Sequence, residues 1–482
     1  MSSKNITFNT IPGNLKKPGL YMEQDTSLAS RALPSTARRI LLIGQRLAAG
    51  TVAQAIPMQI FSEADAATYF GIGSMLHLMC RAAIRQNPYA DITAIGLDDN
   101  GAGVAATGTH TITGPATSAG TIRVYIGDQY VDVAIASGDT ATVIAGNIKA
   151  AINAKTDLPV TGNNVAGVHT VTSRNKGLSA NDIGLGYLIT GATGVACAVV
   201  AMASGATNPV LQTALTAVYG TRYNLIVSQF NNQTDLTTLK THVEAVSGPL
   251  EQRGTVGVYA TTGALAGATT LSGQVNSTRI VGAFVRYTAS TQMQEPSWQV
   301  AAIAAAGVSA ISDIAEPIKN MNLAQIATPA VADRLSRTEQ ESCLNGGVSA
   351  IEVGPGETPR LVRMPTTYIT DPNNQLVYLD IHKIFGMDYV RDAALSDISA
   401  LAPKKIIRDS GPGRVPTVTV LRNIVLSCAY KCQEAGVLTG VTSYKNQFIV
   451  EEDLSNVGQM NILMPSPVVD GLYVVAVKQI LY

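Results

Sequence analysis

Apolar and polar positions follow two different rhythms along the chain. In residues 39–97, and again after residue 208, short apolar runs of strand length alternate with segments whose apolar residues recur every three or four positions. In residues 74–86, for example, Leu76, Met79 and Ala83 fall on one helical face, and Ser74 is a favourable N-cap. Strands that alternate with helices predict a mostly parallel sheet covered by helices on both faces.

Residues 99–206 have a different texture. They are rich in Gly, Thr, Ala and Val, carry few charges and contain neither Phe nor Trp. Alternating runs at residues 121–126 and 130–135 flank Gly127-Asp128, which predicts a β-hairpin. A helix is predicted at about residues 140–155. We therefore predict a β-rich domain inserted into the α/β sheet.

The sequence patterns near the two ends of the chain predict an N-terminal arm and a C-terminal domain. Pro-Gly pairs in residues 1–20 are incompatible with a helix and predict an extended arm, whereas residues 355–365 are interpreted as a connector. Beyond it we predict buried helices at about residues 380–397 and 419–435, the second ended by Gly436, and a strand at 460–464. The predicted organisation is an arm (1–20), a first α/β part (21–98), the insertion (99–206), a second α/β part (207–364) and an α+β domain (365–482).

Residues 472–482 read as a β-strand that is apolar on both faces. Such a strand is normally buried on both sides. Two interpretations follow from the pattern. The segment is either the last strand of the protein's own sheet, or a strand donated to an exposed sheet edge of a neighbouring subunit.

Composition narrows the class of protein. The chain of 482 residues is 46% hydrophobic but only 14% charged, with 34 basic and 34 acidic residues; typical soluble domains are about 25% charged. A neutral, sparsely charged surface favours association. Nucleic-acid binding has no basic block to support it, and no apolar run is long enough to span a membrane. The start lacks the apolar segment of a signal peptide. The cysteines are scattered, which indicates reduced thiols in a cytosolic setting: Cys80, Cys197, Cys343, Cys428 and Cys432.

Candidate chemistry is sparse. The five histidines lie in no zinc-binding spacing. His77 shares a helical face with Arg81 and Arg85, which we interpret as a solvated polar face. Cys428 and Cys432 are one helical turn apart and form half a metal site at most, so core packing is the preferred interpretation.

Nucleotide and hydrolase motifs are also weak. Gly71-Ile72-Gly73 precedes a helix but lacks the third glycine of a dinucleotide loop, and no GxSxG motif is present. Asp98 and Asp99 are adjacent carboxylates at the end of a predicted strand, but neighbouring strand residues point to opposite faces. We interpret them as boundary residues of the insertion. The sequence therefore predicts no catalytic residue, no cofactor and no metal.

Several segments together resemble contractile tail sheath proteins of Mu-like bacteriophages, in an order that spans nearly the whole chain. They are Pro18-Gly19-Leu20-Tyr21-Met22-Glu23, Leu41-Leu42-Ile43-Gly44-Gln45-Arg46-Leu47-Ala48-Ala49-Gly50-Thr51, Phe70-Gly71-Ile72-Gly73-Ser74-Met75, Asn87-Pro88-Tyr89, Ala94-Ile95-Gly96-Leu97-Asp98, Gly103-Val104-Ala105-Ala106-Thr107-Gly108-Thr109, Lys176-Gly177-Leu178-Ser179-Ala180-Asn181-Asp182-Ile183 and Leu463-Met464-Pro465.

The resemblance implies an α/β core that is subtilisin-like in shape but not catalytic. It further implies an inserted β-rich outer domain, a C-terminal α+β domain lining the inside, and extended N- and C-terminal arms that complete β-sheets in neighbouring subunits. The residues expected to link subunits are Ile6, Phe8, Leu472, Tyr473, Val474, Val475, Val477 and Ile480. The basic cluster Lys404, Lys405 and Arg408 is interpreted either as a solvated face or as a contact to the tail tube.

The function implied is that of a structural subunit that forms stacked hexameric rings around a tail tube and contracts during genome ejection. The expected partners are other copies of the chain, the tube protein, and baseplate and tail terminator proteins, without nucleic acid, membrane insertion or a cofactor. The expected location is the virion tail sheath, after assembly in the host cytoplasm. Two alternatives stay open: the sheath of a tailocin or other contractile injection particle, and an α/β hydrolase-like enzyme using Asp98, Asp99 or a cysteine.

Overall fold

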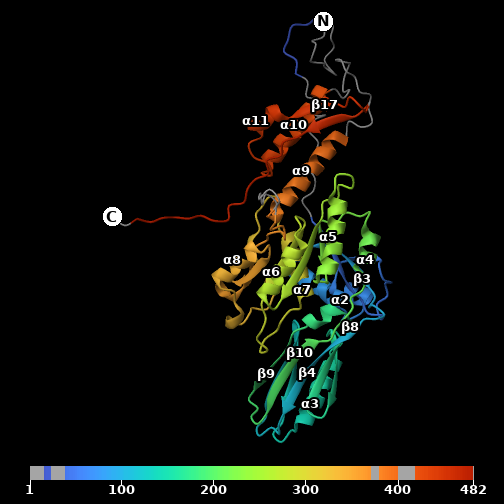
Figure 1. The fold of residues 1–482 in the computed structure, drawn as a ribbon, viewed down its shortest axis with the longest axis vertical. Helices are drawn as coiled ribbons and strands as arrows, with labels where there is room; N and C mark the ends of the chain where they lie inside the picture. Colours follow the sequence, from blue (N-terminus) through green and yellow to red (C-terminus); the bar gives the residue numbers. More distant parts are fainter. Residues whose placement is uncertain (1–15, 23–37, 371–378, 400–417, 457, 481–482) are drawn as a thin grey trace. The chain divides into compact units, whose positions relative to one another are not determined.

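The computed structural model describes residues 16–22, 38–370, 379–399, 418–456 and 458–480 (Figure 1). The chain divides into two compact units. The central unit comprises Ala37–Ile384 and Leu472–Tyr482, and the C-terminal unit comprises Met1–Thr36 and Phe385–Gly471. The last residues of the chain therefore belong to the central unit, although the residues immediately before them belong to the other.

A mixed sheet forms the middle of the central unit, with nine strands among the described residues. In order across the sheet they are β14 (Lys319–Asn322), β16 (Pro359–Arg363), β15 (Ser349–Val353), β13 (Ile280–Val285), β12 (Val256–Thr262), β11 (Leu225–Ser228), β1 (Arg39–Gln45), β3 (Asp91–Leu97) and β2 (Pro57–Ile60). The strands from β15 to β3 are parallel to one another, whereas β2 is antiparallel to β3 and β16 is antiparallel to both of its neighbours, β15 and β14. The predicted mostly parallel sheet is confirmed.

Helices cover both faces of the sheet, because successive strand residues point to opposite faces and both sets are buried. In β1, Leu41 and Ile43 join the apolar cluster of α4 (Leu211–Val218) and α5 (Gln233–Ser247), and the intervening Ile40 and Leu42 are equally buried. The remaining sheet-covering helices are α2 (Met75–Gln86), α7 (Ser297–Ser309), α6 (Leu265–Val275) and α8 (Arg337–Asn345), with α1 (Glu63–Phe70) beside α2. The predicted buried helix at 298–311 is α7, which is apolar all round and buried almost throughout.

The interpretation of residues 355–365 as a connector is wrong. After the short 3-10 helix η3 (Pro355–Glu357), β16 pairs with both β15 and β14. Ile351 of β15 lies opposite Leu361, which is fully buried. Pro359 is tolerated because it is the first residue of the strand. Short, partly polar strands such as these carry too little alternation to be distinguished from a loop.

The insertion contains two antiparallel sheets and the helix α3 (Ala141–Ala154), which contacts both. The sheets run β10 (Ala196–Ala203), β4 (Ala105–Thr113), β8 (Val168–Lys176), β7 (Val160–Val165), and β6 (Gln129–Ile135), β5 (Gly120–Ile126), β9 (Leu185–Thr190); the 3-10 helix η1 (Leu178–Asp182) follows β8. The predicted hairpin at Gly127-Asp128 and the predicted helix are confirmed. The chain enters and leaves the insertion side by side, since Val104 and Ala206 exchange backbone hydrogen bonds of 2.9 and 3.2 Å.

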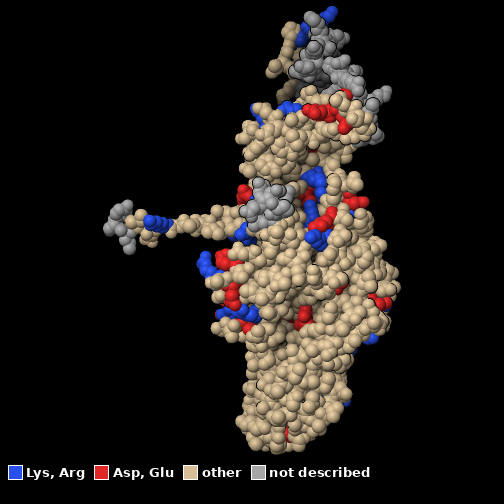
Figure 2. All heavy atoms as spheres, in the orientation of Figure 1, with Lys and Arg blue, Asp and Glu red and all other residues tan. Residues whose placement is uncertain are grey.

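Charged side chains are rare on the insertion. The face seen in Figure 2, over β4, β9, β10 and α3 in Figure 1, shows almost no Lys, Arg, Asp or Glu. Solubility of this part therefore depends on Thr, Ser, Asn and backbone groups. In the described residues, no helix is long and apolar enough to cross a membrane.

The C-terminal unit contains most of α9 (Ile381–Ser399), then α10 (Val418–Glu434), α11 (Val441–Tyr444) with the 3-10 helix η4 (Lys445–Gln447), and the hairpin β17 (Ile449–Glu452) and β18 (Met460–Leu463). Gly436 follows α10 with φ 75°, a left-handed conformation that glycine adopts without strain. Cys428 and Cys432 of α10 are fully buried. The helices, the strand at 460–464 and the core-packing interpretation of these cysteines are confirmed.

The first interpretation of the terminal segment, a last strand in the protein's own sheet, is wrong. Residues 472–480 have no regular secondary structure and pair with no strand of the described chain. Most of their apolar side chains are exposed. The pattern of a buried strand is present in the sequence, but the described residues of the chain include no strand that pairs with it.

Candidate functional site

The carboxyl ends of parallel strands are where α/β sheets commonly bind ligands. Here buried amides fill that position. Gln45 is the last residue of β1, and Gln229 directly follows β11. The Gln45 backbone N–H donates a hydrogen bond to Gln229 Oε1, and Gln229 Nε2 donates one to Gln45 Oε1, each at 2.6 Å. Gln45 Nε2 donates in turn to Asp99 at 2.6 Å. The polar groups at the centre of the sheet edge are thus bonded to one another.

Asp98 and Asp99 bind separate partners rather than acting as a pair. Asp99 accepts hydrogen bonds from Asn175 Nδ2 and from the Lys176 backbone N–H, both at 3.0 Å and both from β8 of the insertion. Asp98 accepts one from Arg46 Nε at 2.6 Å. This arrangement agrees with their interpretation as boundary residues. Asp99 attaches the insertion to the sheet edge.

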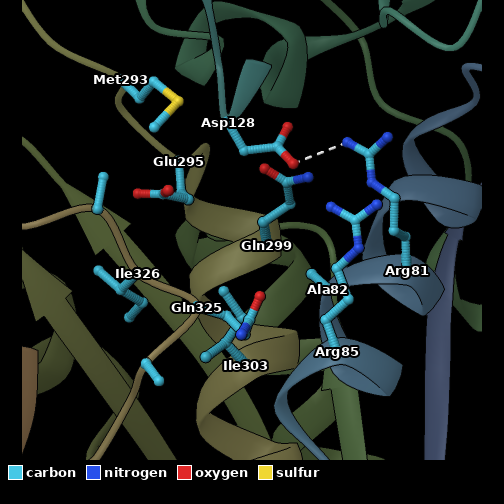
Figure 3. A pocket seen from close by; sticks show the side chains of 12 residues that line it. Arg81, Ala82, Arg85, Asp128, Met293, Glu295, Gln299, Ile303, Gln325 and Ile326 are labelled. Carbon is cyan, nitrogen blue, oxygen red and sulfur yellow. Dashed lines mark hydrogen bonds and ion pairs between the residues drawn. The ribbon is translucent and has the colours of Figure 1, made fainter. Parts of the chain in front are cut away.

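The prediction of a solvated polar face on α2 is wrong for His77 and Arg81, which are both buried; only Arg85, about half exposed, fits it. Arg81 donates to Asp128 of the hairpin turn at 2.7 Å and to Asp157 after α3 at 3.0 Å (Figure 3). The insertion therefore covers this end of α2 and supplies two carboxylates for one guanidinium. We call these three residues the Arg81 joint.

A pocket of about 230 Å³ lies beside the Arg81 joint. Burial raises the pKa of Glu295 to about 7, and Tyr287 donates a hydrogen bond to it at 2.6 Å. The Gln299 side chain lies between Asp128 and Glu295 in Figure 3. Among the described residues lining the pocket there is no Ser, Thr, Cys, His or Lys, so the lining does not form a nucleophile and base pair.

The pKa is raised for four of the five cysteines, whereas the hydrogen bond with Cys428 lowers the pKa of Cys432, which is fully buried. All five are free and buried, and burial raises the pKa of Cys343 to about 11. A thiol with a raised pKa is a poor nucleophile because the thiolate is the reactive form. No cluster of three or more His, Cys, Asp or Glu side chains suited to a metal ion occurs in the part of the chain that the structure describes.

Two buried histidines of the insertion lie next to each other on neighbouring strands of one sheet. His110 of β4 lies opposite His169 of β8, with 5.6 Å between the ring centroids. Both are fully buried. Burial lowers the pKa of each to about 4. Both rings are consequently neutral at physiological pH.

Acidification is expected to destabilise the fold between pH 6.5 and 4. Burial lowers the pKa of His77, His110, His169 and His242 to about 4. Their contribution to the free energy of unfolding is therefore complete above pH 6.5 and is lost as the pH falls through 4. Glu295 acts oppositely, since its contribution is complete below 4.5 and is lost as pH rises through 7. Burial also raises the pKa of Asp182, which acts in the same direction as Glu295, and the four histidines outweigh these two carboxyls. Thermal unfolding at stepped pH values checks this, and a midpoint that rises on acidification would contradict it.

The terminal arm, defined as residues 474–480, exposes most of its large apolar side chains. Val474, Val475, Val477 and Ile480 are between 58% and 85% exposed. Contiguous exposed apolar residues on a soluble chain mark an interaction site. Val474 and Val475 are neighbours in the sequence, so in an extended segment their side chains point to opposite sides.

The hairpin of β17 and β18 is an incomplete sheet. It has two strands, and Ile449 pairs with Leu463 although both are substantially exposed. An isolated two-stranded sheet is marginally stable in water and is normally extended by further strands. The hairpin is therefore a natural acceptor for an additional extended chain.

The structure does not bear on the other predicted site residues. Ile6 and Phe8 of the N-terminal arm, and the basic cluster Lys404, Lys405 and Arg408, lie outside the described residues. Their roles stay predictions.

Comparison with known proteins identifies the family. Residues 204–367 match the central domain of phage tail sheath proteins. The Mu-like prophage FluMu tail sheath protein of Haemophilus influenzae is 30% identical over 471 residues, which cover 95% of this chain and 96% of that protein. The chain belongs to the phage tail sheath family. It is therefore a structural subunit of a contractile tail sheath, and the function predicted from the resemblance is confirmed.

Solved structures show the corresponding fold. The helical sheath of the anti-feeding prophage in its contracted state is similar with a TM-score of 0.50 and 12% identity, covering 97% of this chain and 99% of that one. A sheath tail protein of Desulfitobacterium hafniense aligns with a TM-score of 0.48 and 13% identity, over 90% and 93% of the two chains. The mixed α/β architecture of this sheath subunit is thus a fold that sheath proteins share.

The Arg81 joint was missed in the sheath sequence. Arg81 lies one helical turn after His77 and one before Arg85, a polar spacing that is typical of a solvated face and does not indicate burial. Its carboxylate partners are 47 and 76 residues away along the chain. No local spacing connects them.

Proposed function

We propose that this subunit polymerises as stacked hexameric rings around a tail tube and contracts to drive the tube through the host envelope for genome ejection. The observation that carries the proposal is the terminal arm, whose apolar side chains are exposed on both faces. In a polymer of identical copies, every arm has a neighbouring subunit within reach.

The acceptor we propose is the hairpin of β17 and β18 in a neighbouring copy. Its exposed Ile449 and Leu463 match an apolar strand, and no further strand of the described residues pairs with its outer edges. With one arm added, a marginal two-stranded sheet becomes a three-stranded one. The N-terminal arm, including Ile6 and Phe8, is proposed to add a further strand.

Strand linkage suits a lattice that contracts. Ladder hydrogen bonds between copies persist while rigid units rotate about the connecting chain. The extended sheath is then metastable, and contraction gains free energy by forming larger contacts between subunits. The proposal includes no enzymatic activity, and the sheet edge that could bind a substrate is filled by Gln45, Gln229 and Asp99.

Several finer assignments belong to the same proposal. The α/β core is subtilisin-like in shape, the insertion (99–206) projects outward, and the C-terminal domain (365–482) lines the inside, where Lys404, Lys405 and Arg408 contact the tube. The partners are other copies, the tube protein, and baseplate and terminator proteins, met in the host cytoplasm. A tailocin or other contractile injection particle is the second candidate machine, because the contracted sheath of the anti-feeding prophage has a similar fold.

The decisive experiment is negative-stain electron microscopy of the purified, concentrated chain, alone and with its tube protein. Hollow, striated cylinders built from six-fold rings are the expected result. Monodisperse single copies under every condition, tube included, would overturn the proposal.

Deletion of residues 1–12 is expected to leave a folded subunit that forms no sheath. The removed segment contains the apolar Ile6 and Phe8 but precedes the central sheet, which begins at Arg39. Circular dichroism should match the full chain while electron microscopy shows no cylinders. Normal polymerisation of the deleted chain would disprove the N-terminal linkage.

A further inference from the structure

The arm starts at a defined anchorage on the central unit. The chain leaves the C-terminal unit at Gly471 and rejoins the central unit at Leu472. There Lys319 Nζ, from edge strand β14, donates a hydrogen bond to the Leu472 carbonyl at 3.2 Å. The Leu472 side chain itself is exposed, so the backbone rather than the side chain is held at this residue.

Tyr473 makes the main contacts of this anchorage. The Arg363 guanidinium of β16 lies over its ring, 4.1 Å from the centroid. That guanidinium is itself fixed by two hydrogen bonds of 2.7 Å to the carboxylate of Asp380. A cation held over an aromatic face attracts it, and the attraction is stronger where water is partly excluded.

The hydroxyl end of Tyr473 is also bound. It lies 3.2 Å from Nδ1 of His382, a buried residue at the start of α9, and the two rings meet edge to face with centroids 6.1 Å apart. Burial, followed by the charge of Asp380, raises the pKa of the Tyr473 hydroxyl. The Tyr473 hydroxyl is therefore uncharged across the physiological range.

Tyr473 thus differs from its neighbours on both sides. Leu472 and Val474 expose 66% and 80% of their surface, whereas the Tyr473 ring is packed between β16 and α9. We propose that Tyr473 is the fixed root of the arm, which stays bound to its own central unit while residues from Val474 onward pair with a neighbouring copy. The second half of this statement rests on the proposed function; the first does not.

A fixed root determines which unit carries the arm and how far it reaches. From Val474 to Ile480 an extended chain spans about 23 Å, at roughly 3.3 Å per residue. Without the anchorage, the arm would extend from the C-terminal unit, in which the Val469 N–H donates a hydrogen bond to the Val437 carbonyl. The arm would then be longer and attached to a different unit, which lowers its effective concentration at the acceptor.

The anchorage is tested on the isolated subunit with a fluorescent thiol label on Ala476→Cys. The native cysteines are all buried, so the label reports the arm. Tyr473→Ala is expected to lose the slow component of the anisotropy decay, while Tyr473→Phe, which keeps the ring over Arg363, retains most of it. Tyr444→Ala, a change of a part-exposed tyrosine in the other unit, serves as the matched control. Retention of the slow component in Tyr473→Ala would overturn the proposal.

Assembly provides the second readout. Tyr473→Ala is expected to give far fewer cylinders than the unmodified chain under identical conditions, and Tyr473→Phe a normal yield. Normal yield from Tyr473→Ala, despite a freed label, would overturn the second half of the proposal, because it would show that pairing with a neighbouring copy does not depend on the fixed root. Failure of the unmodified chain to form cylinders with its tube would instead contradict the proposed function and leave the anisotropy result standing.

Discussion

A chain that ends at Tyr473 is expected to fold normally and to form no sheath. The removed residues include Val474, Val475, Val477 and Ile480, which are exposed and pair with no described strand of their own subunit. Removing exposed side chains without partners changes stability by less than about 0.5 kcal/mol. In the assembled sheath the same residues supply both a ladder of backbone hydrogen bonds and two apolar faces, so their loss removes the link between copies.

Sedimentation velocity and electron microscopy on the truncated chain check this expectation, with thermal unfolding to establish that the subunit is intact. Lys478→Ala is the matched control, because it keeps the arm's length and its apolar residues and should assemble normally. Cylinders from the truncated chain, in normal yield, would show that the terminal arm does not link subunits.

Arg81→Met is expected to destabilise the central unit by about 3 kcal/mol, the lower end of what removing one partner of a buried ion pair costs. The methionine retains the apolar stem but leaves the carboxylates of Asp128 and Asp157 without their cation. Since those carboxylates come from the insertion and Arg81 from α2, the loss falls on the contact between the two. Insertion and core should therefore separate more readily.

Chemical denaturation measures the change, and limited proteolysis between insertion and core shows where it acts. Arg85→Met is the matched control on the same helix, because Arg85 is about half exposed and its pairing with Glu63 is worth less than about 1 kcal/mol. Equal destabilisation by the two substitutions would contradict a specific role for the Arg81 joint.

The sequence was sufficient to predict what is set by local periodicity. The helix-period face of Leu76, Met79 and Ala83, the Gly127-Asp128 hairpin and the alternation of strands and helices all appear as predicted. In each of these elements, burial follows from the spacing of apolar residues within one segment. The resemblance to sheath proteins rested on the order in which several short segments follow one another along the chain.

What escaped prediction depends on contacts between distant segments. The burial of His77 and Arg81 is caused by insertion residues that no helical spacing indicates. Strand β16 pairs with β14 on one side and with β15 on the other. These pairings form the strands, because apolar and polar residues do not alternate regularly in the sequences of β14 and β16. For Ser336 and Glu339 a local signal was present, since they form a capping box at the start of α8. The terminal arm is the opposite case, a strand pattern that pairs with no strand in the described part of its own subunit.

The adjacent entry and exit of the insertion have a consequence for how sheath proteins diverge. Val104 and Ala206 are bonded neighbours, so the polypeptide between them can be shortened, lengthened or exchanged without redirecting the strands on either side. The family match begins at residue 204, where this excursion ends. A foreign domain grafted at this pair of residues would need ends that lie equally close together, and it would also have to replace the contacts that the insertion makes to Arg81 and Asp99.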